Sequence, residues 1–275
     1  MKSLSIIGAG KVGRVFGRQL ALHGVFDVSQ VLNRSLASAR QAVGFIGAGV
    51  AVADWSALRK TDIYLLSVPD DRIAAICETL WQRKLLDRHS LVFHCSGAKA
   101  STELAAATTA GAAVASVHPV RSFADVEAVS AGFAGTICSL EGDTRALAVL
   151  TPALEAIQAQ VVQISAEAKL LYHAGSVFAS NYLVSLMDVA LRTYAAAGIP
   201  PATAKAMAAP LAQQTLDNVF RLGAEQALTG PIARGDMLTV EQQLQKVADW
   251  DETAAGIYRS FIPATVNLAA RKKKT

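Results

Sequence analysis

Residues 4–17 constrain the fold of this 275-residue chain more than any other segment. They read Leu-Ser-Ile-Ile-Gly-Ala-Gly-Lys-Val-Gly-Arg-Val-Phe-Gly, an apolar run followed by the pattern G-x-G-x-x-G and the start of an amphipathic stretch. This order is typical of a strand that turns into a helix around the phosphates of a dinucleotide. Gly8 would make the tight turn, Gly10 would let the backbone approach a pyrophosphate, and Gly13 would let the helix pack closely on the strand.

We therefore expect a dinucleotide to contact this loop, while a glycine-rich turn without a ligand stays the alternative. The expected contact residues are Gly8, Ala9, Gly10, Lys11, Val12 and Gly13.

The second expected strand ends in Asn33, Arg34 and Ser35. An acidic residue at this place would hold the ribose 2′-hydroxyl of NAD, but a guanidinium and a hydroxyl suit the 2′-phosphate of NADP. Asp27 lies at the other end of that strand. The sequence therefore predicts NADP, unless Arg34 is only a solvated loop charge.

Two later strand ends extend the predicted cofactor site, because ligands of open α/β sheets lie outside the carboxyl ends of the strands. Either turn could also be ordinary loop chemistry. The residues expected to line the ribose and nicotinamide are Val68, Pro69, Asp70, Ser96 and Gly97.

The first half of the chain alternates short apolar runs with amphipathic stretches, which predicts a doubly wound, mainly parallel sheet of the Rossmann type. After about residue 165 the apolar runs stop and helical patterns dominate. We expect a cofactor-binding domain over residues 1–165 and an all-helical substrate and dimerisation domain over residues 166–275. The expected strands are 3–8, 27–33, 51–53, 62–68, 90–95, 113–117, 135–140 and 160–164, and the expected helices are 166–197, 202–222, 240–250 and 253–270.

Three side chains are candidates for acid, base or polarising chemistry. His118 follows a buried strand and precedes Pro119, and a neutral-pH imidazole there could move a proton or simply cap the strand. Lys169 and His173 are four residues apart and share one face of the first long helix. They could polarise a carbonyl and relay a proton, or form an exposed face.

Two further residues are candidates for substrate contacts. Asn181 lies two turns beyond His173 on the same expected helix. Arg234 lies in a Gly- and Pro-rich string, residues 228–236, where it could hold a substrate carboxylate or pair with Asp236. The string could equally mark a turn at a dimer contact.

The charge distribution, the cysteine spacing and the apolar segments argue against several other classes of protein. The formal charge of +4 comes from four basic residues near the C-terminus, Arg271 to Lys274, so only a frayed tail is basic and we expect no nucleic-acid partner. The three cysteines are widely spaced and predict neither disulfides nor a metal site. The N-terminus leaves no room for a signal peptide, and Asp188 and Arg192 interrupt the most apolar region, which predicts a cytoplasmic chain without a membrane partner.

Taken together, these strings resemble the Rossmann-like proteins with a DUF2520 domain, in the 6-phosphogluconate dehydrogenase-like superfamily of NADP oxidoreductases. The resemblance spans nearly the whole chain, and residues 230–236 are its most specific string. It implies a helical C-terminal domain of the 6-phosphogluconate dehydrogenase type that commonly builds a homodimer. It also implies a catalytic lysine with a polar residue four positions later, here Lys169 and His173.

The substrate class does not carry over, because His173 replaces the asparagine found in 3-hydroxyacid dehydrogenases and ketopantoate reductases. His118-Pro119 is instead similar to a turn of prephenate dehydrogenases. The resemblance implies an NADP-dependent oxidoreductase acting on a small keto acid, ketopantoate-like, or an imine acid. A non-catalytic sensor of NADP(H) is the alternative, and it would need no function for Lys169.

Overall fold

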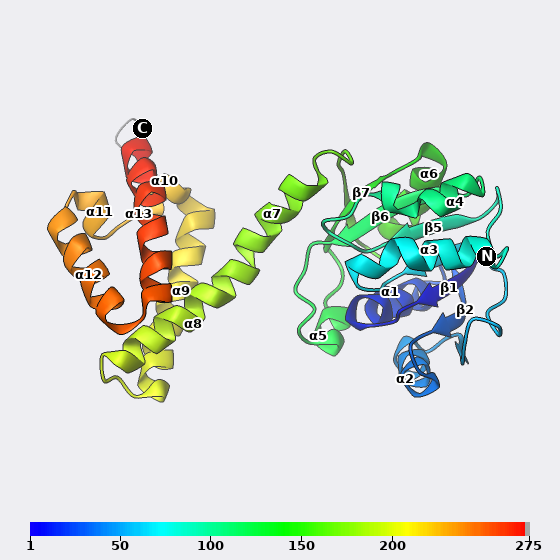
Figure 1. Cartoon of the computed structure of the whole chain (residues 1–275), viewed down its shortest axis with the longest axis horizontal. Coiled ribbons are helices and arrows are strands. Elements are labelled where there is room, and N and C mark those ends of the chain that lie inside the picture. The colour runs from blue at the N-terminus through cyan, green and yellow to red at the C-terminus, as the bar shows by residue number, and fades with distance from the viewer. Residues whose placement is uncertain (273–275) are drawn as a thin grey trace. The chain divides into compact units, whose positions relative to one another are not determined.

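The computed structural model describes residues 1–272 and divides into two compact units, one of residues 1–178 and one from Ala179 onward. Figure 1 gives the element labels used below. Lys273 and Lys274 of the basic C-terminal end lie outside the described residues. Arg271 and Lys272 are not frayed as expected, because they complete the last helix, and Arg271 pairs with Glu225 at 3.1 Å.

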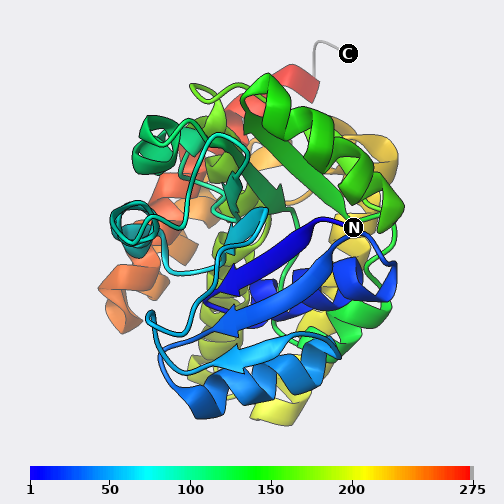
Figure 2. The ribbon, with the colours of Figure 1, turned by 90° about the vertical axis from the view of Figure 1, so that its right-hand side faces the viewer.

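The first unit is built on one sheet in the order β3-β2-β1-β4-β5-β6-β7-β8. All neighbouring strands are parallel except β6 and β7, which are antiparallel. Figure 2 shows the first strands running side by side in one direction. The strands are β1 (Ser3–Ile7), β2 (Asp27–Leu32), β3 (Val50–Val52), β4 (Ile63–Leu66), β5 (Leu91–His94), β6 (Ala113–Pro119), β7 (Ile137–Gly142) and β8 (Gln160–Gln163).

Helices cover both faces of this sheet, because its strands carry apolar side chains on both sides. Leu4 and Ile6 face one core with α1 and α2, whereas Ile7 faces the other with α3 and α4. The order in which strands are added reverses at β1, because β2 and β3 lie on one side of it and β4 lies on the other, and ligands of doubly wound sheets bind at such a point. The helices are α1 (Lys11–Leu22), α2 (Leu36–Ile46), α3 (Ile73–Gln82), α4 (Ala105–Thr109), α5 (Val126–Ala131), α6 (Thr144–Ala156) and α7 (Lys169–Ala179), with single 3-10 turns at Asp70–Arg72 and Ser101–Leu104.

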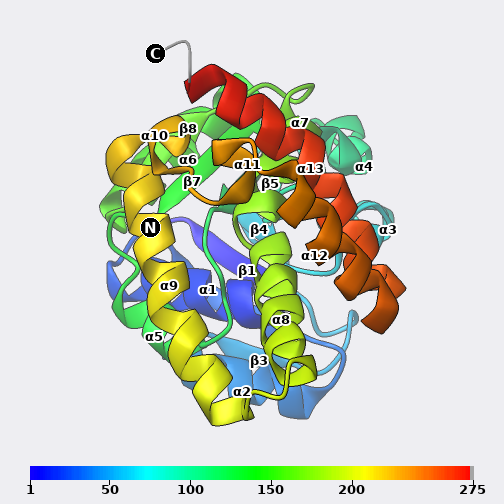
Figure 3. The ribbon, with the colours of Figure 1, turned by 90° about the vertical axis from the view of Figure 1, so that its left-hand side faces the viewer.

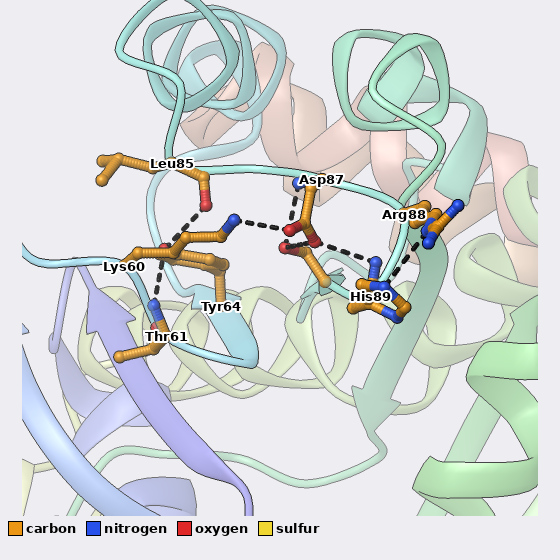
Figure 4. A network of polar contacts seen from close by, with 8 residues as sticks. Lys60, Thr61, Tyr64, Leu85, Asp87, Arg88 and His89 are labelled. Carbon is orange, nitrogen blue, oxygen red and sulfur yellow. Dashed lines mark hydrogen bonds and ion pairs between the residues drawn. The ribbon is translucent and has the colours of Figure 1, made fainter.

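The loops that precede β1, β4 and β5 form what we call the amino edge of the sheet. A network of polar contacts holds this edge together (Figure 4). The Tyr64 hydroxyl accepts from the Thr61 N–H at 2.9 Å and donates to the Leu85 carbonyl at 3.1 Å. The Asp87 carboxylate accepts from Lys60 at 2.5 Å and from the His89 N–H at 2.8 Å. Each of these polar side chains has a protein partner, which is the pattern of a structural network.

The second unit is helical throughout the part that the structure describes. Helix α8 contacts α9, and α12 contacts α13, which runs beside it in Figure 3. Asp236 accepts from the Thr239 N–H at 3.2 Å and so caps α12. The helices are α8 (Asn181–Ala196), α9 (Pro201–Leu222), α10 (Ala224–Ala227), α11 (Pro231–Arg234), α12 (Met237–Trp250) and α13 (Glu252–Lys272).

The expected fold class is confirmed, and all eight expected strands are present. The single helix expected over 166–197 is interrupted, because Ser180 leaves helical geometry at φ −127° and α8 starts anew. The two compact units divide after Phe178, so nearly all of α7 belongs to the unit that contains the sheet. The expected boundary after Ser165, between a cofactor-binding domain and a substrate domain, stays a prediction. Within residues 1–272, the stretch 169–196 is long and apolar enough to cross a membrane. Length and composition by themselves are weak evidence for a membrane-spanning helix.

Candidate functional site

The glycine loop lies at the carboxyl edge of the sheet, which we define as the loops after β1, β2, β4, β5 and β6. Gly8 has φ +81°, and a Cβ there would lie 2.7 Å from the Ser67 carbonyl oxygen and collide with Val68. A Cβ at Gly13 would lie 2.9 Å from the Ser67 Cβ, so both positions require glycine. Gly10 has open space around it and begins α1 without a side-chain cap. The first N–H groups of α1 are therefore available to an anion.

The remaining loop residues support this turn. Ala9 is buried and its N–H donates to Asn33 Oδ1 at 2.6 Å. Lys11 is exposed and its ammonium donates to the Ala124 carbonyl at 3.1 Å, and Val12 packs against the core. Asn33 also donates to the Ser38 carbonyl at 3.1 Å, so its amide ties the glycine loop to α2.

The end of β2 carries an exposed cation. Arg34 is exposed and has no hydrogen bond or ion pair within residues 1–272. Beside it, Ser35 caps α2 by accepting from the Ser38 N–H at 3.2 Å. A free guanidinium next to a helix N-terminus is a suitable environment for a phosphate.

The loops after β4 and β5 are joined by one hydrogen bond. Ser96 donates to Asp70 at 2.7 Å, while its oxygen accepts from the Lys99 N–H at 2.9 Å. His94 is fully buried, and its Nδ1 accepts from the Ser96 N–H at 3.2 Å while its Nε2 lies 3.1 Å from the Ala100 carbonyl. The second contact requires the proton on Nε2. Burial lowers the pKa of His94 to about 4, so the ring is neutral and holds this turn in place. Val68 and Pro69 lie in the loop after β4, and the Val68 side chain lies beside Gly8.

Lys169 begins α7 and is 1% exposed, yet its ammonium nitrogen has no hydrogen-bond partner among the described residues. Burial lowers the pKa of Lys169, and the nearby Glu141 carboxylate partly opposes that shift. Glu141 forms no salt bridge with it, because its two oxygens accept from the Ser101 N–H at 2.6 Å and hydroxyl at 2.8 Å. A buried amine without a partner is costly, and such groups mark places where a ligand completes the hydrogen bonding.

His118 and His173, which we call the histidine pair, meet beside Lys169. Their ring centroids are 5.4 Å apart at an angle of 83°. The His118 Nδ1 lies 2.9 Å from the Tyr172 hydroxyl, and His173 Nδ1 is buried without a partner within residues 1–272. Burial, with smaller contributions from His173 and Lys169, lowers the pKa of His118 to about 4. His118 is therefore neutral at physiological pH.

Cys95 lies near Lys169, and Cys138 lies near Cys95, but neither offers a nucleophile. Burial raises the pKa of Cys95 and raises that of Cys138 to about 12. Both thiols stay protonated, and no group of three or more metal-binding side chains occurs in the part of the chain that the structure describes. The chemistry available at this place is that of an amine and two imidazoles.

The structure thus brings most of the expected site residues to one sheet edge. Asn181 and Arg234 belong to the second unit, where both are exposed, and their roles stay predictions. No ion pair joins Arg234 to Asp236, whose carboxylate caps α12. Sequence reasoning missed three residues, Glu141, His94 and Tyr172. Only Glu141 leaves a signal, as a lone charge at the end of an apolar strand.

Two family models match the chain: a Rossmann-like domain over residues 1–119, and DUF2520, a domain of unknown function, over residues 136–265. The chain contains a Rossmann-like domain followed by a DUF2520 domain. The matched Rossmann-like segment contains the glycine loop, Gly97 and His118, whereas the DUF2520 segment contains Glu141, Lys169 and the residues of α7. The candidate site of this DUF2520 protein is therefore made from both segments, although all of it lies in the first compact unit.

Solved structures share the whole fold of the DUF2520 protein. A protein from Thermotoga maritima is 25% identical, with coverage of 98% of this chain and 99% of that one and a TM-score of 0.75. A candidate NADP oxidoreductase from Bacteroides fragilis is 19% identical, with coverage of 97% and 98% and a TM-score of 0.78. A pyrroline-5-carboxylate reductase from Coxiella burnetii is 17% identical, with coverage of 98% of both chains and a TM-score of 0.56. No curated protein matches the sequence.

Proposed function

We propose that this protein is an NADP-dependent oxidoreductase that reduces a small keto acid or imine acid by hydride transfer. One observation carries the proposal: the amine of Lys169, 1% exposed and without a partner among the described residues, lies near Cys95 and Asp70 in the loops after β5 and β4. Several proteins with the same fold are named as reductases, including pyrroline-5-carboxylate reductases and imine reductases.

The glycine loop fits a dinucleotide. Gly8 has the backbone conformation of the phosphate-binding turn, and Gly10 leaves open space before the uncapped N-terminus of α1. Arg34 would pair with the 2′-phosphate, which favours NADP over NAD. When bound, the reduced nicotinamide would supply a hydride, and the loops at Asp70 and Ser96 would border its ring.

Lys169 is the proposed catalytic residue. Its ammonium would donate a hydrogen bond to the substrate oxygen or nitrogen and stabilise the negative charge that develops there. It would then give that atom a proton, and its lowered pKa makes it a better acid than an ordinary lysine. The neutral His118 would orient the substrate through a hydrogen bond, and His173 would relay protons. Asn181 and Arg234 would contact the substrate carboxylate.

The test is a panel of 2-keto acids, ketopantoate-like ones first, and cyclic imine acids, each assayed with NADPH and with NADH. We expect turnover with NADPH for at least one compound. Lys169→Ala should lower kcat at least about 10³-fold while NADPH affinity changes by less than a few fold. Lys246→Ala, which removes a lysine whose side chain is 84% exposed, is the matched control.

Binding of NADPH with no turnover across the panel would contradict the enzyme and favour the NADP(H) sensor. Unchanged turnover in Lys169→Ala would remove Lys169 from the mechanism. Faster turnover with NADH would contradict the assignment of Arg34.

We further propose a cytoplasmic homodimer formed through the helical unit, without a nucleic-acid or membrane partner. A groove of about 710 Å³ supports the dimer, because mainly apolar side chains of α8, α12 and α13 line it, among them Val189, Ile257 and Phe261. Contiguous exposed apolar surface favours protein contacts. Light scattering coupled to size-exclusion chromatography would test the dimer, and a monomer at all concentrations would contradict it.

A further inference from the structure

Gly97 provides the surface on which the histidine pair meets. A Cβ at Gly97 would lie 2.8 Å from His118 Nε2 and 2.7 Å from His173 Cε1, and would collide with His173 Nδ1. Both rings therefore pack directly against the glycine backbone. The two nitrogen atoms, His118 Nε2 and His173 Nδ1, face the same small space.

Tyr172 holds the other side of His118. Its hydroxyl lies 2.9 Å from His118 Nδ1, and the two rings meet edge to face with centroids 5.8 Å apart. Among residues 1–272, one nitrogen of His118 has a hydrogen-bond partner, and the other faces Gly97 and His173. The proton of a neutral imidazole can sit on either nitrogen, and the partner of one decides the character of the other.

The 2.9 Å contact of Tyr172 with His118 is compatible with donation in either direction, because a protonated hydroxyl can both donate and accept. Burial raises the pKa of the Tyr172 hydroxyl, which keeps it protonated at physiological pH, and the nearby Ser139 hydroxyl partly opposes that shift. A neutral His118 carries a single ring proton. When the hydroxyl donates to Nδ1, that ring proton must be on Nε2.

We propose that Tyr172 is a positioning residue that fixes His118 as a hydrogen-bond donor to the substrate, which selects a keto acid over an imine acid. This inference rests on the proposed function. A carbonyl oxygen has two lone pairs and can accept from Lys169 and from His118 Nε2 together. A protonated imine has no lone pair and is itself a donor, so it would need an acceptor at this position. The opposite tautomer of His118 would offer that acceptor.

The proposed step balances without a further reactant. A hydride would leave a C–H bond of the reduced nicotinamide and add to the carbonyl carbon, the C=O π electrons would move to the oxygen, and the oxygen would take a proton from Lys169. His118 keeps its proton and only donates a hydrogen bond throughout, and the product is the 2-hydroxy acid with oxidised cofactor.

The first test is ¹⁵N NMR of the full chain with labelled histidine, which reports the protonation of each ring nitrogen. We expect His118 to be protonated on Nε2 and not on Nδ1 in the wild-type protein. In Tyr172→Phe the tautomers should mix, because the donor to Nδ1 is gone. Tyr258→Phe, which removes the 2.7 Å hydrogen bond to Gln243 in the second unit, is the matched control and should leave His118 unchanged.

The second test is specificity. The ratio of kcat/KM for the best keto acid to that for the best cyclic imine acid should fall about tenfold in Tyr172→Phe, mainly through kcat. Circular dichroism confirms that each variant is folded.

Absence of turnover across the panel would contradict the proposed function. Protonation of His118 on Nδ1 in the wild-type protein, an unchanged tautomer in Tyr172→Phe, or a preference for imines would overturn the role of Tyr172 even in an active enzyme.

Discussion

The two edges of the sheet carry similar polar side chains, which have hydrogen-bond partners at the amino edge and, among the described residues, partly lack them at the carboxyl edge. At the amino edge, Lys60 pairs with Asp87, and the Tyr64 hydroxyl both accepts and donates (Figure 4). At the carboxyl edge, Lys169 Nζ and His173 Nδ1 are buried, and neither has a partner within residues 1–272. Polar groups that are satisfied by the protein stabilise it, whereas buried groups left unsatisfied cost free energy that a ligand can recover. The contrast separates a structural network from a binding site.

Acid should affect the carboxyl edge first and most strongly. Burial lowers the pKa of His94 and of His118 to about 4, below the value of about 6.5 in an unfolded chain. Between these values the unfolded state binds more protons, so the free energy of unfolding falls as the pH drops from about 6.5 toward 4. The two histidines together should remove roughly 2–5 kcal/mol across that window. Urea unfolding at pH 7 and at pH 5 measures the effect.

Two variants assign this acid effect to an edge. His118→Asn should reduce the difference between the two pH values. Asp87→Asn should leave that difference unchanged, because the hydrogen bond from Lys60 lowers the pKa of Asp87 to about 2, well outside the window. If Asp87→Asn reduced the difference in unfolding free energy between the two pH values and His118→Asn did not, the acid effect would belong to the amino edge.

Tyr64→Phe should weaken the protein at the amino edge alone. It leaves the buried Thr61 N–H and the Leu85 carbonyl without their partner, which should lower the free energy of unfolding by about 1–3 kcal/mol. NADPH affinity should not change, since the hydroxyl lies at the opposite ends of the strands. Thermal unfolding and a fluorescence titration with NADPH test both statements, and a large loss of affinity would contradict the separation of the edges.

Lys169→Met should stabilise the protein slightly, in contrast to Tyr64→Phe. Methionine fills a similar volume without a buried polar atom, so the free energy of unfolding should rise by about 1 kcal/mol. Lys60→Met is the matched control, and it should bring no gain because its ammonium pairs with Asp87. A destabilised Lys169→Met would show that the ammonium has a partner in the folded protein.

The sheet could be predicted because buried strands are short apolar runs separated by turn residues. The antiparallel direction of β7 could not be assigned, since a strand buried on both faces has the same pattern in either direction. The interruption at Ser180 also leaves no signal, because no glycine or proline marks it.

The site was partly predictable for a similar reason. The four-residue spacing of Lys169 and His173 places them on one helical face, and His118, expected just after a strand, lies one residue before the end of β6. The contact of Tyr172 with His118 joins residues 54 positions apart, and only the folded chain brings them together. Likewise, the loop that Asn33 holds closed is visible only once β1 and β2 are paired.

The close fit at Gly97 also has a genetic consequence. Every single-nucleotide change that replaces a glycine adds at least a Cβ, and a Cβ here meets both imidazoles at once. No conservative neighbour is therefore reachable in one step, and a lineage that loses this glycine would need matching changes at positions 118 and 173 to restore the contact. Residue 97 should consequently tolerate less variation in a mutational scan than either histidine that packs against it.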